Sequence, residues 1–373
     1  MQAPLRLLTA LRGSTEAGLM LAMAVATATF VATPLVLSSV AERFEVGTGT
    51  AGLFSAAQLG AFVVGSWVSG RFVEASRRLF VQALVLLAVA NALSAVVSVF
   101  VFLVIVRAGA GLALGVLAWL AYSQVFGDSE RTGDIAVIGP LTGVVMAPLF
   151  GVVLASGDDR AVFGVLAGLA LAPLLRVPHF VAVESEESDR NKPVPQALAL
   201  VAALGVVTFG GSAVFVFAGA IAADKYGMAP FMISLVFASN AGASIPSARW
   251  RGARPLAGAW FLVPALCAGL LGFFDQAPVF WVILTVWGFC FWMATPGVYT
   301  LLASRSRHPA ERAGDAQASM AAGRALGPLV GGLLISSGSY AVLGVVGGAV
   351  IAIAAAVIVG VELIGTRDTV SAS

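Results

Sequence analysis

The chain has 373 residues, of which 59% are hydrophobic and only 11% are charged, and its formal net charge is +2. Soluble domains carry roughly a quarter charged residues, so this composition excludes a water-soluble globular protein for most of the chain. The small net charge gives no reason to expect a nucleic-acid partner.

Twelve apolar runs follow one another, each close to the roughly 20 residues that a membrane-spanning helix needs. The sequence therefore predicts an all-α integral membrane protein with twelve transmembrane helices. A β-barrel is excluded because the hydrophobicity is continuous and does not alternate. The third and fourth runs meet near Ser98 with hardly a polar break, so that hairpin is inferred from length alone. The runs cover residues 17–40, 51–70, 79–97, 99–121, 135–155, 161–182, 197–222, 228–247, 256–274, 278–303, 316–336 and 340–364.

A polar segment at residues 184–195 divides the chain near its midpoint. We interpret it as a flexible cytoplasmic linker between an N-terminal six-helix bundle, residues 1–183, and a C-terminal six-helix bundle, residues 196–373. A regulatory or partner-binding role of this segment is the alternative.

An internal repeat relates the two bundles. The pentapeptide ERTGD at residues 130–134 returns as ERAGD at residues 311–315, and two further anchors match at the same offset of 181 residues. Such symmetry is typical of transporters built from repeats. Each copy precedes an apolar run, so we expect Asp134 and Asp315 to cap spans 5 and 11 and to interact with their helix dipoles. At this offset Gly143 corresponds to Arg324, and the symmetry is broken there.

Cations in the predicted loops set the orientation. The loops on the side of the termini hold 16 Lys and Arg residues and the opposite loops hold three, which predicts that both termini are cytoplasmic. Arginine far outnumbers lysine, which indicates a GC-rich bacterial genome and hence a multi-pass protein of the bacterial inner (plasma) membrane. Because the first run is too long for a signal-peptide core, we expect it to stay as a helix.

No feature of the sequence predicts an enzyme. Cys267 and Cys290 fall inside spans and imply neither a disulfide nor a metal site. Histidine, acidic and serine residues form no cluster with catalytic spacing, and no phosphate-binding loop is present. We therefore expect no cofactor, no metal and a monomeric protein.

Two six-span halves, a central cytoplasmic linker and cytoplasmic termini resemble the major facilitator superfamily. After span 2 this family carries Gly-x-x-x-Asp-Arg-x-Gly-Arg-Arg, which acts as a cytoplasmic gate latch. Here Arg71 and the pair Arg77-Arg78 resemble the motif, but Gly70 stands at the aspartate position and Glu74 is the available substitute. The alternative is that these arginines only set the topology.

Two further motifs carry the resemblance. In span 4, Arg107 is followed by spaced glycines, and the family associates this arginine with proton coupling or substrate contact; the alternative is that it snorkels to the outer interface. The Gly-Pro-x-x-Gly-Gly motif that many family antiporters carry in span 5 stands here in span 11. We expect it to pack the two halves together and to take part in gating. Its defined positions are Gly327, Pro328, Gly331 and Gly332.

The family further implies that spans 1, 4, 7 and 10 line a central cavity. Span 10 has one helical stripe that combines aromatic area with polar groups, although such a stripe is also common in helix packing. Spans 1 and 7 offer softer surfaces suited to a moderately apolar solute. The candidate substrate residues are Trp281, Thr285, Trp292 and Tyr299 with Gly288 and Thr295 in span 10, Met23, Thr27 and Phe30 in span 1, and Thr208, Ser212 and Phe215 in span 7.

Arg324 lies about twelve residues before the end of span 11, or roughly 18 Å, which is near the bilayer midplane where such folds bind substrate. No Asp or Glu lies deep inside any span. We hypothesise that the substrate is anionic, with Arg107 and Arg324 as its counter-charges. The alternative is that backbone carbonyls or Gln58, Asn91 and Asn240 satisfy the two arginines.

Together these features predict a drug- or metabolite-exporter-like secondary active transporter that moves a small anionic or amphiphilic organic solute by alternating access. Its expected partners are that solute, protons and the lipid bilayer. The form we expect is a proton-coupled exporter or antiporter. An uncoupled facilitator, and a receptor or sensor with a degenerate transporter fold, are the alternatives.

Overall fold

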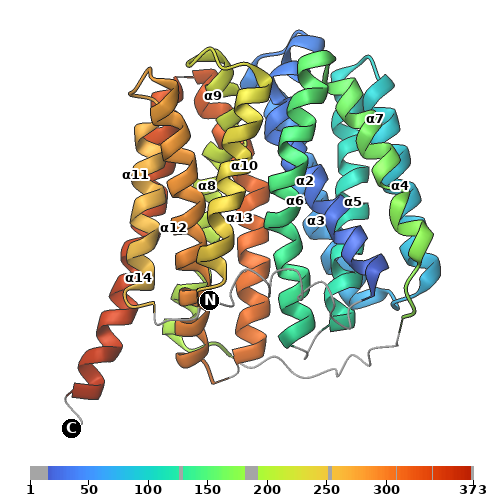
Figure 1. Cartoon of the computed structure of the whole chain (residues 1–373). Helices are drawn as coiled ribbons and strands as arrows, with labels where there is room; N and C mark the ends of the chain where they lie inside the picture. Colours follow the sequence, from blue (N-terminus) through green and yellow to red (C-terminus); the bar gives the residue numbers. More distant parts are fainter. Residues whose placement is uncertain are drawn as a thin grey trace, which may run out of the picture.

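The structure is a computed structural model that describes residues 16–125, 129–180, 192–250, 254–307, 309–337 and 339–370. The regular elements in these ranges are helices, and Figure 1 shows them side by side in one bundle. The part before the linker, here called the N half, contains α2 (Ala17–Arg43), α3 (Thr48–Phe72), α4 (Arg77–Val96), α5 (Phe100–Val125), α6 (Ser129–Ser156), α7 (Asp159–Leu169) and η2 (Ala172–Arg176).

The part after the linker is called the C half. It contains α8 (Pro195–Phe215), α9 (Ala218–Asp224), α10 (Pro230–Ala248), η3 (Ala257–Phe261), α11 (Leu262–Leu270), α12 (Ala277–Ser304), α13 (Pro309–Ser337) and α14 (Tyr340–Val370).

The predicted membrane spans are confirmed as helices. In the described ranges, ten helical segments are long and apolar enough to cross a membrane. The sixth and ninth predicted spans are shorter, because α7 with η2 and η3 with α11 replace single long helices, and the seventh is interrupted between α8 and α9. The hairpin inferred at Ser98 is correct, since α4 ends at Val96 and α5 begins at Phe100.

Local chemistry explains several helix starts. The Ser76 hydroxyl accepts from the Leu79 amide at the start of α4, and Asp158 Oδ1 accepts from the Ala161 amide at the start of α7. Proline stands in the first turn of α8, α10 and α12, where its missing N–H costs nothing.

The expectation that Asp134 and Asp315 cap their helices is wrong. Helix α6 begins at Ser129 and α13 at Pro309, so both aspartates lie inside the helices. Proline favours the first helical position, which lets α13 start before the apolar run does. Asp315 Oδ2 instead lies 2.6 Å from Arg312 Nη1, one turn away. The side chain of Asp134 lies outside the described residues.

The two halves touch closely at the end of the bundle remote from the linker, here called the far side. Helices α3 and α13, and α6 and α10, pack across the boundary. A Cβ added at Gly49 of α3 would lie 2.3 Å from the Gly332 carbonyl oxygen of α13, and one at Gly219 of α9 would lie 2.1 Å from the Pro34 carbonyl oxygen of α2. Backbones can approach this closely only where side chains are absent. In Figure 1 this far side, with α7 and α9, is at the top.

The repeat seen in the sequence has a counterpart in the packing. Helices α3 and α5 cross where Gln58 meets Arg107, and helices α10 and α12 cross where Asn240 meets Gly288. Gly288 follows Arg107 at the repeat offset of 181 residues, and Asn240 follows Gln58 within one residue of it. The same crossing therefore occurs in both halves, with an arginine in one and a close glycine contact in the other.

Candidate functional site

Arg324 lies on α13, about 22 Å along the helix from its first residue at 1.5 Å per residue. Its side chain is exposed, although α13 packs against both α3 and α8. The guanidinium interacts electrostatically with Tyr299 of α12 and Tyr122 of α5. No hydrogen bond or ion pair joins it to any residue that the structure describes. Arg324 is therefore an unpaired cation between helices of both halves.

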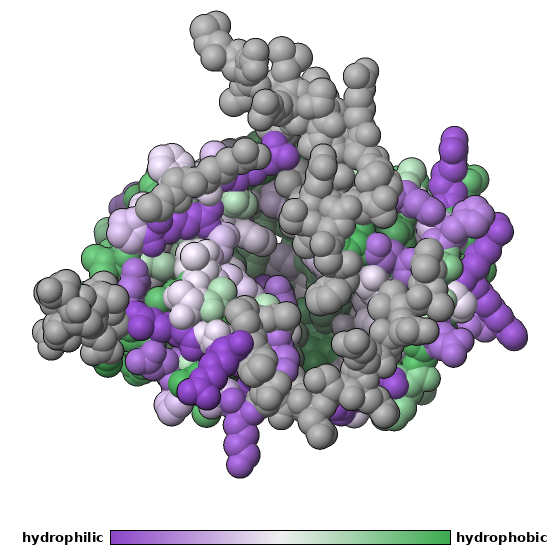
Figure 2. Space-filling model, turned by 90° about the horizontal axis from the view of Figure 1, so that it is seen from below, coloured by the Kyte–Doolittle hydropathy of each residue, from purple (hydrophilic) through white to green (hydrophobic). Residues whose placement is uncertain are grey.

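Figure 2 shows the molecule from the linker side. Hydrophilic side chains gather around the rim of this face, and its surface is hollowed near the middle. Arg324 is exposed in the middle of a packed helix and interacts with tyrosines of both halves, and from this we infer that these three side chains face this recess.

Two tyrosines flank Arg324. Tyr299 donates from its hydroxyl to Met320 Sδ at 3.6 Å, one turn before Arg324. Tyr122, which sequence reasoning missed, is 44% exposed and lies three residues before the end of α5. In the sequence it looked like an ordinary interfacial tyrosine at the end of a span, and only the packing brings it to Arg324.

Arg107 has a different environment. It is 1% exposed and donates from Nε to Gln58 Oε1 at 3.0 Å and from Nη1 to Asn91 Oδ1 at 2.7 Å. Its Cζ lies 5.0 Å from the centre of the Phe163 ring. Gln58 and Asn91 are two of the amides that the structural alternative proposed as partners. The structure does not bring Arg107 and Arg324 together.

The candidate residues of span 10 lie along α12, and the two ends of this stripe have different neighbours. Toward its start, the Thr285 and Ser239 hydroxyls are 2.8 Å apart, and Gly288 packs on Asn240 of α10. Toward its end, Tyr299 faces Arg324. The remaining members are Trp281 and Trp292, which are half-buried, and Thr295, which is buried and donates to the Phe291 carbonyl.

Two candidates of span 7 fasten the helix that carries Arg324. Thr208 Oγ1 lies 3.0 Å from the Met320 carbonyl oxygen and equally close to carbonyl oxygens of its own helix, and Ser212 Oγ lies 3.3 Å from the Gly323 carbonyl oxygen. Each hydroxyl therefore shares its one proton between α8 and α13. These bonds join α8 to the turn of α13 just before Arg324, so they position it. Phe215 instead stacks edge-on against Phe237, with ring centres 5.3 Å apart.

The candidates of span 1 lie on the half-buried side of α2. Phe30 meets Phe62 of α3 edge-on at 5.4 Å, and Met23 packs against the same apolar cluster of the N half. Thr27 lies one turn from each of them and is also half-buried.

The candidate latch residues lie in and around the turn between α3 and α4. Arg71, Glu74, Arg77 and Arg78 are exposed, and Arg71 lies over the Trp67 ring at 5.1 Å. Glu74 forms no ion pair with the described residues. In this conformation the turn is therefore open to solvent.

The glycine motif of α13 makes two kinds of contact. Gly327 and Gly331 face α8 of their own half, where an added Cβ would lie 2.0 Å from Ser212 Oγ and 2.3 Å from the Ala213 carbonyl oxygen. Gly332 faces the other half, where an added Cβ would lie 2.4 Å from the Gly49 carbonyl oxygen, and the Pro328 carbonyl oxygen borders Gly52 of α3. Part of the motif thus packs the halves together and part packs the C half internally.

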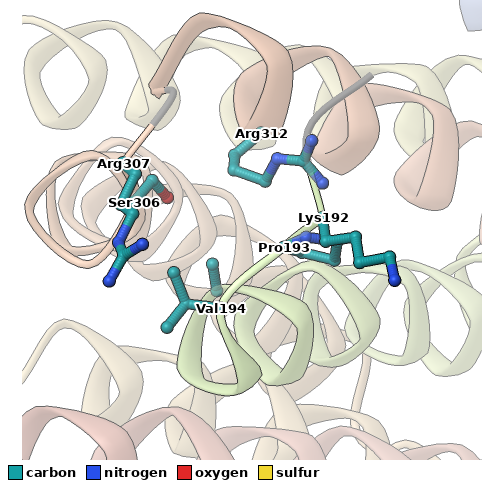
Figure 3. A pocket seen from close by; sticks show the side chains of 7 residues that line it. Lys192, Pro193, Val194, Ser306, Arg307 and Arg312 are labelled. Atoms are coloured by element: carbon teal, nitrogen blue, oxygen red, sulfur yellow. The ribbon is translucent and has the colours of Figure 1, made fainter. Parts of the chain in front are cut away.

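A small pocket lies where the linker enters α8. Figure 3 shows Lys192 and Arg307 at its edges, with Arg312 of α13 beside them. Arg312 is ion-paired with Glu311 and Asp315, so the other two cations give this corner its positive charge.

Metal-ligating residues do not gather in the described part of the chain, where no group of three His, Cys, Asp or Glu side chains is placed to hold an ion. Cys267 and Cys290 are both buried and free.

Residues 18–321 match the sequence model of the Major Facilitator Superfamily. The structure is similar to that of a bacterial homolog to the human lysosomal transporter Spinster, inward-facing and unoccupied, with 15% identity, a TM-score of 0.68 and 98% of each chain covered. It is also similar to the structure of the nucleoside transporter NupG, with 14% identity, a TM-score of 0.69, and 92% of this chain and 98% of that chain covered. A third similar structure is that of the human organic anion transporter MFSD10, with 16% identity, a TM-score of 0.61, and 91% of this chain and 97% of that chain covered. These likenesses show the fold. No curated protein sequence matches the chain.

Proposed function

Because the chain belongs to the major facilitator superfamily, and is a membrane transporter and not an enzyme, we propose that it is a secondary transporter that moves a small organic anion by alternating access. The observation that carries this proposal is Arg324, an exposed cation between the halves that no acidic side chain pairs within the described residues.

The chemistry of the site favours an anion. Arg324 offers five N–H donors in a planar fork that matches a carboxylate or phosphate, and the phenols of Tyr122 and Tyr299 can add O–H donors. An arginine at the centre of a membrane helix costs about 3 kcal/mol on insertion scales, and either water in the recess or a bound anion offsets this cost. Substrate binding at Arg324 therefore replaces its hydration with charge-assisted hydrogen bonds.

Alternating access is supported by the difference between the two ends of the boundary. Backbones touch on the far side at Gly49 and Gly332, while the linker side is hollowed. If both termini and the linker are cytoplasmic, as the cation distribution predicts, this is a state open to the cytoplasm. Rocking of one half against the other would move the opening to the far side.

Proton coupling is the second part of the proposal, and few residues could carry it. No acid faces Arg324 in the described part, so protons would enter with the substrate or through acids at helix ends. Glu16, which accepts from the His179 amide at 2.9 Å, and exposed Glu42 are the candidates. Proton-coupled export stays a prediction. An uncoupled facilitator and a non-transporting sensor are the alternatives.

Proteoliposomes test the proposal. Purified protein would be assayed for uptake of labelled aromatic and aliphatic carboxylates, with and without a pH gradient. We expect at least one to be transported, and Arg324→Gln to reduce its transport about tenfold or more, since a hydrogen bond to a charged group contributes about 1.5–3 kcal/mol. The matched control is Arg160→Gln at the far-side start of α7, where the side chain is 53% exposed. Equal transport by the folded Arg324→Gln protein and wild type would contradict the proposal.

A further inference from the structure

A buried polar cluster inside the N half carries positive charge without an acid in contact with it. Arg107 of α5 donates to Gln58 Oε1 of α3, to Asn91 Oδ1 of α4 and, at 3.4 Å, to Ser94 Oγ. All three partners are neutral. Among the residues that the structure describes, no carboxylate pairs with this guanidinium, although Arg107 is 1% exposed.

Three buried donors lack a partner, two of them on the amides that contact Arg107. Gln58 Nε2, Asn91 Nδ2 and Ser55 Oγ have no hydrogen-bond partner in the described part of the protein. Ser55 and Gln58 lie three residues apart on α3, so they share one helix face. Buried unpaired donors are rare in folded proteins unless water or an ion completes them. Because these donors accompany a cation, an anion is the species that completes both.

One acid belongs to this network, and it is already paired with another arginine. Asp159 Oδ2 lies 2.9 Å from Arg43 Nη1, and both side chains are buried, at 0% and 8% exposure. Arg43 Nη2 also donates to the Ser94 carbonyl at 3.0 Å, so Ser94 connects the two arginines. The network therefore holds two guanidinium groups and one carboxylate, which leaves a net positive charge.

The corresponding place in the C half lacks both the charge and the unpaired donor. There Gly288 replaces the arginine, and Asn240 Nδ2 donates to the Leu284 carbonyl at 2.6 Å. The helix crossing in the C half is thus closed with its amide donor paired, so the two halves differ at this place by the charge of Arg107 and by the unpartnered donors.

We propose that Ser55, Gln58, Asn91 and Arg107 form a binding site for a small inorganic anion of chloride type inside the N half. A monatomic anion fits because α3, α4, α5 and, through Phe163, α7 surround the cluster, and the unpartnered amide nitrogens of Gln58 and Asn91 are donors. The site is separate from the recess at Arg324, and the ion acts as a structural counter-charge.

Thermal unfolding of the purified full-length protein tests this site without any transport assay, so its outcome is independent of the proposed function. Unfolding would be followed in sodium chloride, bromide and gluconate at equal ionic strength. We expect both halides to raise the unfolding midpoint saturably over gluconate. At 100 times the dissociation constant, the ratio of folded to unfolded protein rises about 100-fold.

Two variants locate the effect. Gln58→Glu places a fixed carboxylate against Arg107 and should abolish the halide dependence. Asn240→Asp, at the related position of the C half, should keep it. The inference is overturned if wild type shows no halide effect, or if the effect persists unchanged in Gln58→Glu.

A crystal grown in bromide gives a readout that does not depend on how the variants fold. An anomalous peak beside Arg107 supports the inference, and bromide found only elsewhere overturns it.

Discussion

A methyl group at Gly49 is expected to open the far side of the transporter. Its Cβ would lie 2.3 Å from the Gly332 carbonyl oxygen and 2.4 Å from Ser336 Oγ, whereas ordinary contacts begin at 3.4 Å. Helices α3 and α13 must therefore separate by about 1 Å, and such overpacking costs about 1–3 kcal/mol. If the far side is open in the alternative state, this cost applies only to the closed state and shifts the equilibrium about 5- to 150-fold.

The assay is a distance measurement between spin labels on the two halves at the far side. Ser156→Cys at the end of α6 and Gln276→Cys before α12 are exposed label sites, in a background where Cys267 and Cys290 are replaced by alanine. Gly49→Ala should increase the fraction of long distances.

The matched control for this experiment is Gly60→Ala on the same helix. An added Cβ at Gly60 meets nothing within 4 Å, so the distance distribution should equal that of the labelled parent. The reasoning is refuted if Gly49→Ala leaves the distribution as unchanged as Gly60→Ala does.

Two further substitutions probe the supporting contacts. Asp159→Asn leaves the buried guanidinium of Arg43 without its carboxylate, so we expect stability to fall by about 3–5 kcal/mol, measured as a lower unfolding midpoint. An unchanged midpoint would show that the pair is dispensable. Thr208→Val removes the hydroxyl contact with the Met320 carbonyl, so it should weaken substrate affinity and lower stability by about 1 kcal/mol. The control Thr300→Val, on an exposed face, should change neither affinity nor stability. Equal substrate affinities in the two variants would argue against a positioning role of Thr208.

The fold was predictable because hydrophobicity in a membrane is a strong signal. Twelve apolar runs predicted the helices, and even the hairpin at Ser98 was placed correctly from length alone. The breaks were not predictable. The stop between α8 and α9 and the shortness of α11 occur inside apolar sequence, where composition does not distinguish one long helix from two short ones.

The candidate site was predictable only in part. Arg324 was singled out by its depth and by the glycine at its counterpart position, and the structure shows it exposed. Tyr122 could not be found, because only tertiary packing brings the end of α5 to α13. Thr208 and Ser212 belong to the soft surface predicted for span 7, but their hydroxyls also contact the backbone of α13, which periodicity on a single helix cannot reveal.

The central claim is that Arg324 recognises the negatively charged group of the substrate. The most direct measurement compares a transported carboxylate with its uncharged carboxamide, as competitors for uptake, in wild type and in Arg324→Gln. We predict that wild type prefers the carboxylate at least tenfold and that Arg324→Gln loses this preference. A preference that survives in Arg324→Gln, or that is absent in wild type, would contradict the claim.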